Sequence, residues 1–150
     1  MELQEIFDTA VDGVLTQGKQ AMLDRACVLK TPGPQPNKCA VGWLIPDDKY
    51  TVKLEQYAGL EDYGYPDYAP SDRLEEFQKT PLFDVLDPLI GPMTEQHFEL
   101  LKSLQDAHDS LEFVSPDEPE KQALIRNFSK VAKTFGLSNH IIIKHKDAAA

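Results

Sequence analysis

The segment Lys38-Cys39-Ala40-Val41-Gly42-Trp43-Leu44-Ile45-Pro46-Asp47-Asp48 decides the fold of this chain. It contains the single Trp and one of the two Cys residues, and no charged residue interrupts it between Lys38 and Asp47. Buried apolar side chains of this size each contribute roughly 1.5–3 kcal/mol to stability, which is more than surface features contribute. We therefore expect Cys39 to Ile45 to form the buried centre of the protein.

A β-hairpin is expected around this segment. Residues 26–30 and 38–42 read as two strands, and the loop between them holds three Pro and one Gly. If the strands pair symmetrically about that loop, Leu29 faces Cys39, and Cys27 lies on the same buried face. The two Cys residues are then diagonal neighbours with Cα atoms roughly 7–8 Å apart, beyond comfortable disulfide reach. We therefore expect two buried thiols and no disulfide.

Helical periodicity dominates the rest of the chain. Apolar residues recur at three- and four-residue spacing, and capping residues, Pro and Gly mark the ends. The first expected helix runs from Leu3 to its stop at Gly18, and the second runs from Asp47 to Gly59. Two short helices start at Ser71 and at Thr80-Pro81, and Pro88 breaks the chain after them. The last two helices run from Thr94 to about His108 and from Ser115 or Asp117 to Gly136. Residues 139–144 fit either a terminal strand, which would pair with the hairpin, or a tail. The predicted fold is α+β, a mostly helical single domain packed around a small antiparallel β-hairpin or sheet.

Length and composition agree with one globular domain. The chain has 150 residues, of which 41% are hydrophobic and 27% charged, so it can bury one core and is too apolar for a disordered protein. We expect the domain to span residues 1–147, and Ala148 to Ala150 resemble a cloning-vector scar. No apolar run approaches the roughly 20 residues of a membrane helix, and the first residues lack signal-peptide features. Two Cys residues without such a signal favour a cytoplasmic protein.

The formal net charge of −10 limits the classes of partner. Binding to nucleic acid depends mainly on Lys and Arg neutralising phosphates, so we expect no direct nucleic-acid binding. The same charge disfavours anionic membrane surfaces. The acidity then serves either solubility alone or a surface for a basic partner.

Acidic and Tyr residues are concentrated in one part of the chain. All five Tyr lie between Tyr50 and Tyr68, and residues 47–87 contain eleven acids against four bases, a net charge of −7. Tyr provides rigid contact area and is enriched at interfaces. The predicted partner-binding residues are Glu61, Asp62, Tyr63, Tyr65, Asp67, Tyr68, Asp72, Glu75 and Glu76. The alternative is that these rings pack over the hairpin while the acids solvate a loop.

One combination of residues has the types needed for nucleophilic catalysis. Cys39 with His108 and Asp109 could form a Cys-His-Asp site. Against this, free Cys is among the most buried residue types, and Cys39 is not at a helix start that would activate its thiolate. We therefore favour a core position for Cys39 and expect no catalytic residue.

The sequence also predicts neither a metal site nor a cofactor. His97 and His108 share a helix face, but eleven residues at 1.5 Å rise separate them by about 16 Å, so they cannot share one ion. The chain lacks an H-x-x-x-H or C-x-x-C spacing and a Gly-rich phosphate loop. We expect a structural role for His108 at the end of its helix, with a bond to the Pro46-Asp47 turn.

Two motifs resemble signatures of a known group of proteins. The segment from Cys39 to Tyr50 resembles a C-A-x-G-x-L-I-P-D-x-x-Y signature, and the segment from Leu104 to Asp109 resembles an L-Q-x-x-H-D signature. Both are similar to small uncharacterised proteins of tailed phages and prophages. The resemblance implies a phage-encoded accessory protein in the cytoplasm of a bacterial host, and it implies no activity, substrate or catalytic residue.

Two classes of function follow from these observations. The favoured one is a phage-type accessory protein that binds a host or defence protein with a basic surface through the acidic, Tyr-rich segment, without catalysis. Nucleic-acid mimicry is its most specific form, because spaced carboxylates would occupy a basic groove in place of phosphates. The alternative is a small Cys/His-dependent hydrolase or transferase that uses Cys39, His108 and Asp109.

Overall fold

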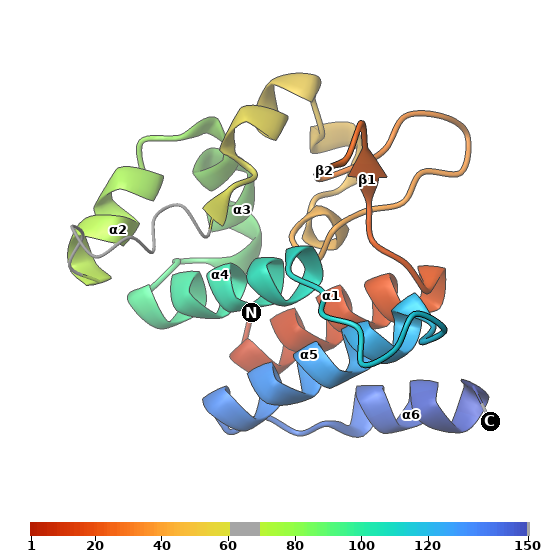
Figure 1. Cartoon of the computed structure of the whole chain (residues 1–150). Helices are drawn as coiled ribbons and strands as arrows, with labels where there is room; N and C mark the ends of the chain where they lie inside the picture. Colours follow the sequence, from red (N-terminus) through yellow and green to blue (C-terminus); the bar gives the residue numbers. More distant parts are fainter. Residues whose placement is uncertain (61–69, 150) are drawn as a thin grey trace.

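The computed structural model describes residues 1–60 and 70–149, without the side chains of residues 70–72, 148 and 149. Its elements in chain order are α1 (Leu3–Gln17), β1 (Met22–Leu23), β2 (Ala26–Cys27), the 3₁₀ helices η1 (Gly42–Leu44), η2 (Asp47–Lys49) and η3 (Val52–Tyr57), then α2 (Pro70–Phe77), α3 (Pro81–Ile90), α4 (Glu95–Asp109), α5 (Glu120–Phe135) and α6 (His140–Ala149). Figure 1 shows a mostly helical molecule with one short antiparallel β1–β2 hairpin at its edge, beside the loop that follows β2. The predicted α+β, mostly helical fold is confirmed.

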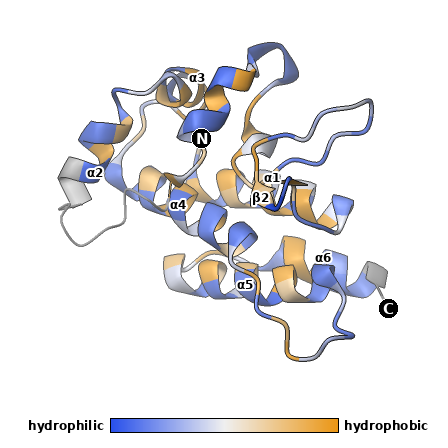
Figure 2. Ribbon diagram, turned by 45° about the horizontal axis from the view of Figure 1, so that its top comes forward, coloured by the Kyte–Doolittle hydropathy of each residue, from blue (hydrophilic) through white to orange (hydrophobic). Residues whose placement is uncertain are grey.

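Helix α1 is the central element of the helical part. It contacts η1, α4, α5 and α6, and Figure 2 shows apolar stretches on α1, α4 and α5 where these helices meet. A helix with a broad apolar face is stabilised by such surrounding contacts. Its fully buried residues are Ile6, Phe7, Ala10, Val11, Val14 and Leu15. The helix ends as predicted at Gly18, whose φ of 75° is in the left-handed region that glycine adopts without steric cost.

The Lys38–Asp48 segment is buried as expected, but it is not a strand. The predicted register is present only at its start, where Lys30 forms an isolated antiparallel bridge with Lys38, and the Cys39 amide donates to the Leu29 carbonyl at 3.2 Å. The chain then turns into η1. A Cβ on Gly42 would overlap the carbonyl oxygen of Leu29, so only glycine permits this close approach of the two segments.

The hairpin that forms lies earlier in the chain than predicted. Met22 pairs with Cys27 in β1 and β2, and the connecting residues Asp24 and Arg25 have φ values of 52° and 68°. Two successive positive φ values match the twist of a tight two-residue hairpin. Cys27 therefore lies opposite Met22 and is partly exposed, so its predicted burial is wrong.

Most predicted helix ends are confirmed by their capping contacts. Thr80 and Thr94 cap α3 and α4 by accepting hydrogen bonds from the amides of Phe83 and His97. Helix α5 ends at Gly136, after which the Leu137 amide donates to the Ala132 carbonyl, the bond of a Schellman motif.

Three further predictions of secondary structure are wrong. Residues 47–59 form η2 and η3 rather than one helix, α3 continues through Pro88, and α5 begins at Glu120 instead of 115 or 117. Residues 140–144, for which the sequence left a terminal strand or a tail open, belong to α6 instead. Packing on α1 favours the helix there, because Ile142 is 1% exposed and His145 bonds to Asp12 of α1 at 2.8 Å.

Across residues 1–60 and 70–149, none of the helices combines the length and the apolar composition needed to cross a lipid bilayer.

Candidate functional site

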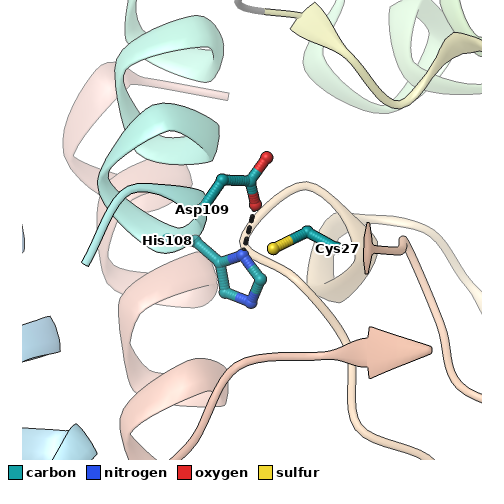
Figure 3. A group of neighbouring side chains, drawn as sticks. All are labelled: Cys27, His108 and Asp109. Carbon is teal, nitrogen blue, oxygen red and sulfur yellow. Dashed lines mark hydrogen bonds and ion pairs between the residues drawn. The ribbon is translucent and has the colours of Figure 1, made fainter. Parts of the chain in front are cut away.

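The structure brings Cys27, His108 and Asp109 together at the end of α4. Cys27 comes from β2, whereas His108 and Asp109 form the last turn of α4 (Figure 3). The Cys sulfur, an imidazole nitrogen and a carboxylate oxygen all lie within 4.8 Å of one another. The residue types are those of the alternative Cys39, His108 and Asp109 site considered from the sequence, but Cys27 takes the place of Cys39.

His108 is fully buried, and both of its ring nitrogens have partners. Its Nε2 accepts a hydrogen bond from the Ala21 amide at 3.0 Å, and its Nδ1 lies 2.6 Å from Oδ1 of Asp109. A backbone amide can only donate, so Nε2 carries the lone pair. The neutral ring therefore holds its proton on Nδ1 and donates it to Asp109. These partners replace the predicted bond to the Pro46-Asp47 turn.

The same region satisfies the carbonyls that end α4. Gln20 Nε2 donates to the carbonyls of His108 at 2.7 Å and Asp109 at 3.3 Å, and the Gln20 amide donates to Glu120 Oε2 at 2.7 Å. Asn127 of α5 donates to the carbonyl of Ala107 at 3.0 Å. The last carbonyls of a helix lack partners within the helix, so these contacts act as a cap. The residues around His108 thus join α4, α5 and the chain that follows α1.

Cys39 lies inside the core, as we expected from its apolar surroundings. It is 0% exposed, and its sulfur accepts a hydrogen bond from the Gly42 amide at 3.2 Å. Burial raises the pKa of the Cys39 thiol to about 12, against the smaller lowering effect of that hydrogen bond. A thiol with this pKa is protonated at neutral pH and is a poor nucleophile.

Gln105 connects the two signature segments. Its Oε1 accepts from the Val41 amide at 3.3 Å, and its Nε2 donates to Asp109 Oδ1 at 3.3 Å. Gln105 also hydrogen-bonds to the Cys39 side chain. The C-A-x-G segment and the L-Q-x-x-H-D segment are therefore parts of one packed unit, although 64 positions separate Val41 from Gln105.

Both ring nitrogens of His108 form hydrogen bonds with groups other than Cys27. The basic nitrogen of His108 faces Ala21, and its proton-bearing nitrogen faces Asp109. The Cys27 sulfur lies 3.2 Å from the sulfur of Met22, its cross-strand neighbour. The hydrogen bonds from Ala21 to His108, and from His108 and Gln105 to Asp109, form a network at the end of α4.

The donor set also does not fit a metal ion. A metal held between Cys27, His108 and Asp109 requires a lone pair on Nδ1 of His108. The bond from Ala21 places the lone pair on Nε2 instead, and that nitrogen points away from the other two ligands. Binding an ion here would require breaking the buried bond to the backbone.

Most of the predicted partner-binding residues lie outside the described part of the chain. Glu61, Asp62, Tyr63, Tyr65, Asp67 and Tyr68 fall there, as does the side chain of Asp72. On α2, Glu75 is exposed and Glu76 forms a 3.0 Å ion pair with Lys79.

The two Tyr residues in the described part of the chain, Tyr50 and Tyr57, pack against the core. Tyr50 and Tyr57 are partly buried against the core, and the Tyr50 hydroxyl donates to Glu55 at 2.6 Å. Burial, together with the Glu55 carboxylate, raises the pKa of Tyr50. Glu55 also accepts from the Leu29 and Lys30 amides at 2.8 and 3.2 Å, so this carboxylate fixes the chain before the Pro-rich loop.

Comparison with known proteins found no matching family model, no matching curated protein and no matching solved structure.

Proposed function

We propose that this protein is a phage-type accessory protein that binds a basic surface of a host or defence protein and has no catalytic activity. The acidic, Tyr-rich segment, residues 57–76, supplies the binding surface, and nucleic-acid mimicry is the most specific form of this activity. The observation that carries the proposal is the pattern of hydrogen bonds around His108, in which both ring nitrogens have partners. The one Cys-His-Asp group among the described residues holds the fold together, with its proton positions fixed by Ala21 and Asp109.

Charge on the described residues beside the segment supports the proposal. Asp48, Glu75 and Asp84 are exposed, and none of them forms an ion pair with a described side chain. Unpaired exposed carboxylates keep their full charge for steering a basic partner. Such attraction is screened beyond about 8 Å at physiological salt and acts mainly on the association rate. Tyr side chains would hold the complex once it has formed.

The first experiment tests the charges. A partner recovered from host lysate at low salt is purified, and its binding kinetics are measured with the E61Q/D62N/D67N variant. We expect slower association and a weaker dependence on salt than for the wild type. The control variant E95Q/E112Q/D117N removes three exposed charges elsewhere and should retain wild-type association.

The second experiment tests the Tyr anchors with the same partner. Replacing Tyr63 or Tyr65 by Ala should speed dissociation about tenfold or more, because interface mutations act mainly on the dissociation rate. Tyr57, which packs against the core, should instead lower stability when replaced. Wild-type kinetics in both the charge and the Tyr variants would show that the segment is only a solvated loop.

A further inference from the structure

The C-terminal helices have the opposite charge to the rest of the chain. Residues 120–146 contain six bases, Lys121, Arg126, Lys130, Lys133, Lys144 and Lys146, against the single acid Glu120, a net charge of +5 within a chain of −10. These residues lie on α5 and α6, which pack side by side. A local cluster of bases attracts anionic groups even in an acidic protein, because charges more than a Debye length away are screened.

The basic side chains border a hollow on these two helices. It has a volume of about 600 Å³, with Ile125 and Ser129 of α5 in its lining and Lys130, Lys133 and Lys146 around them. All three Lys residues are exposed, and none forms an ion pair with a carboxylate in the described ranges. The hollow therefore combines Ile125 with three Lys residues that have no described carboxylate partner, and the Arg126–Glu118 pair also lines it.

The loop between α4 and α5 adjoins this hollow and has a fixed shape. Arg126 of α5 donates to both carboxylate oxygens of Glu118, at 2.7 and 2.9 Å, and to the Glu112 carbonyl. Glu118 in turn accepts from the Val114 amide at 3.3 Å. Bidentate pairs of this kind fix geometry as well as adding energy.

The apolar side chains of this loop face solvent. Phe113 is 50% exposed and Val114 75% exposed, and Figure 2 shows apolar colour in the loop before α5. They line a second hollow of about 630 Å³ together with Pro116 and Glu118. A hydrophobic pair held exposed on a fixed loop is typical of an interaction site rather than of random surface variation.

We propose that the α5–α6 hollow and the 112–118 loop form a second binding surface, which takes an acidic protein segment with an apolar anchor residue. Carboxylates of the segment would pair with Lys130, Lys133 and Lys146, and its anchor would contact Phe113 and Val114. The exposed Phe113 and Val114 offer an apolar contact that a side chain of a protein segment can fill and a phosphate backbone cannot, so a protein segment fits better than a nucleic acid.

This surface lies apart from α2, the described helix that carries Glu75 and Glu76. Figures 1 and 2 both place α2 and α3 on the opposite side of the molecule from α6. Glu75 and Glu76 of α2 therefore lie apart from Lys130, Lys133 and Lys146, so partners of opposite charge at these two places would not compete. The inference does not depend on the proposed function, because its residues and its partner are different.

The test uses a fluorescein-labelled peptide of Glu residues with interspersed Leu, followed by fluorescence anisotropy. The wild type should bind it, and the K130E/K133E variant should bind at least about tenfold more weakly. The control K49E/K53E reverses two exposed charges elsewhere and should bind as the wild type does. The V114S variant should weaken binding of the Glu-Leu peptide but leave a matched Glu-Ser peptide unaffected.

Four outcomes would overturn the proposal. In the first two, the wild type fails to bind the peptide, or K130E/K133E and K49E/K53E weaken binding equally. In the third, the wild type binds a single-stranded oligonucleotide more tightly than the peptide. In the fourth, the wild type self-associates in sedimentation velocity and K130E/K133E abolishes the self-association. The last two would assign the surface to nucleic acid or to a second copy of the chain. Because the replaced side chains are exposed, circular dichroism should show wild-type folding for every variant.

Discussion

The two Cys residues occupy contrasting environments although the sequence favours burial for both. Cys39 is fully buried in the core, and Cys27 is partly exposed on the short hairpin. The difference arises from the chain path, because β2 pairs with β1 and not with the Cys39 segment. The two thiols should therefore react with a thiol reagent at different rates.

We expect native protein at mildly alkaline pH to react with a thiol reagent at Cys27 first. Burial raises the pKa of Cys39 to about 12, so very little thiolate is present there and the reagent has no access. Peptide mass spectrometry after timed labelling identifies the modified residue. C27S should abolish the early reaction, and both Cys residues should react after unfolding in urea. Early labelling of Cys39 would contradict this assignment.

His108 should contribute strongly to stability. It is 0% exposed and its ring satisfies the Ala21 amide and bonds to Asp109, so H108A leaves buried polar groups without partners. We expect a loss of about 2–4 kcal/mol in the free energy of unfolding, measured by urea denaturation. The exposed His140 provides the comparison, and H140A should change stability by less than about 0.5 kcal/mol. Similar small effects for both would refute the network described around α4.

Part of the candidate site could be predicted from the sequence. The core position of Cys39 and a structural His108 at a helix end both follow from apolar surroundings and helical spacing. The approach of Cys27 to His108 does not, because it depends on the tight turn at Asp24-Arg25. Asn-Gly or Asp-Gly would have signalled such a turn, but Asp-Arg carries no such preference.

At the scale of elements, local signals predicted helices far better than strands. Caps such as Thr94 and the left-handed Gly136 act within a few residues, so the sequence carries them directly. The apolar run at 141–143 has high β propensity but forms α6, because packing against α1 overrides that preference. The strand predicted at 38–42 fails since Gly42 and Trp43 turn away after one bridge.

The contribution of the Glu118–Arg126 pair, in the loop between α4 and α5, to the free energy of unfolding should depend on pH. Hydrogen bonds from Arg126 lower the pKa of Glu118 below its ordinary value of 4.5. A carboxyl with a lowered folded pKa stabilises the folded state above the unfolded pKa, and this contribution is lost as the pH falls through the folded pKa. The stability difference between wild type and E118Q should stay constant down to about pH 5 and shrink at lower pH.

Urea unfolding at a series of pH values from about 7 to about 3 measures that difference. E112Q serves as the control, because Glu112 is exposed and contributes its carbonyl rather than its carboxylate to Arg126. A difference that grows in acid would contradict the proposed role of the Glu118–Arg126 pair.

At the scale of the whole molecule, α6 covers one side of the central helix α1. Ile142 is buried there, His145 bonds to Asp12, and Gln4 exchanges hydrogen bonds with the backbone of Ser138. Helix α6 is therefore part of the core and not an appendage.

Truncation after Ser138 should lower the free energy of unfolding by about 3 kcal/mol or more. The loss of Ile142 alone removes roughly 1.5–3 kcal/mol of apolar burial, and the contact to Asp12 adds to it. Thermal and urea unfolding of the truncated chain measure the effect. Removal of residues 148–150 alone is the matched control and should leave the midpoint unchanged. An unchanged midpoint in the longer truncation would show that α6 does not contribute to the core.

The single Trp, Trp43, allows unfolding of the molecule to be followed by fluorescence. Trp43 packs directly on Gly13 of α1, its indole N–H donates to Gln17 at 3.2 Å, and the Lys38 ammonium lies 4.9 Å from its ring centroid. Its emission therefore reports one place only, the junction of α1 with η1. Separation of these elements would move the indole into water and shift the spectrum to longer wavelength, so unfolding can be followed optically without attaching a dye.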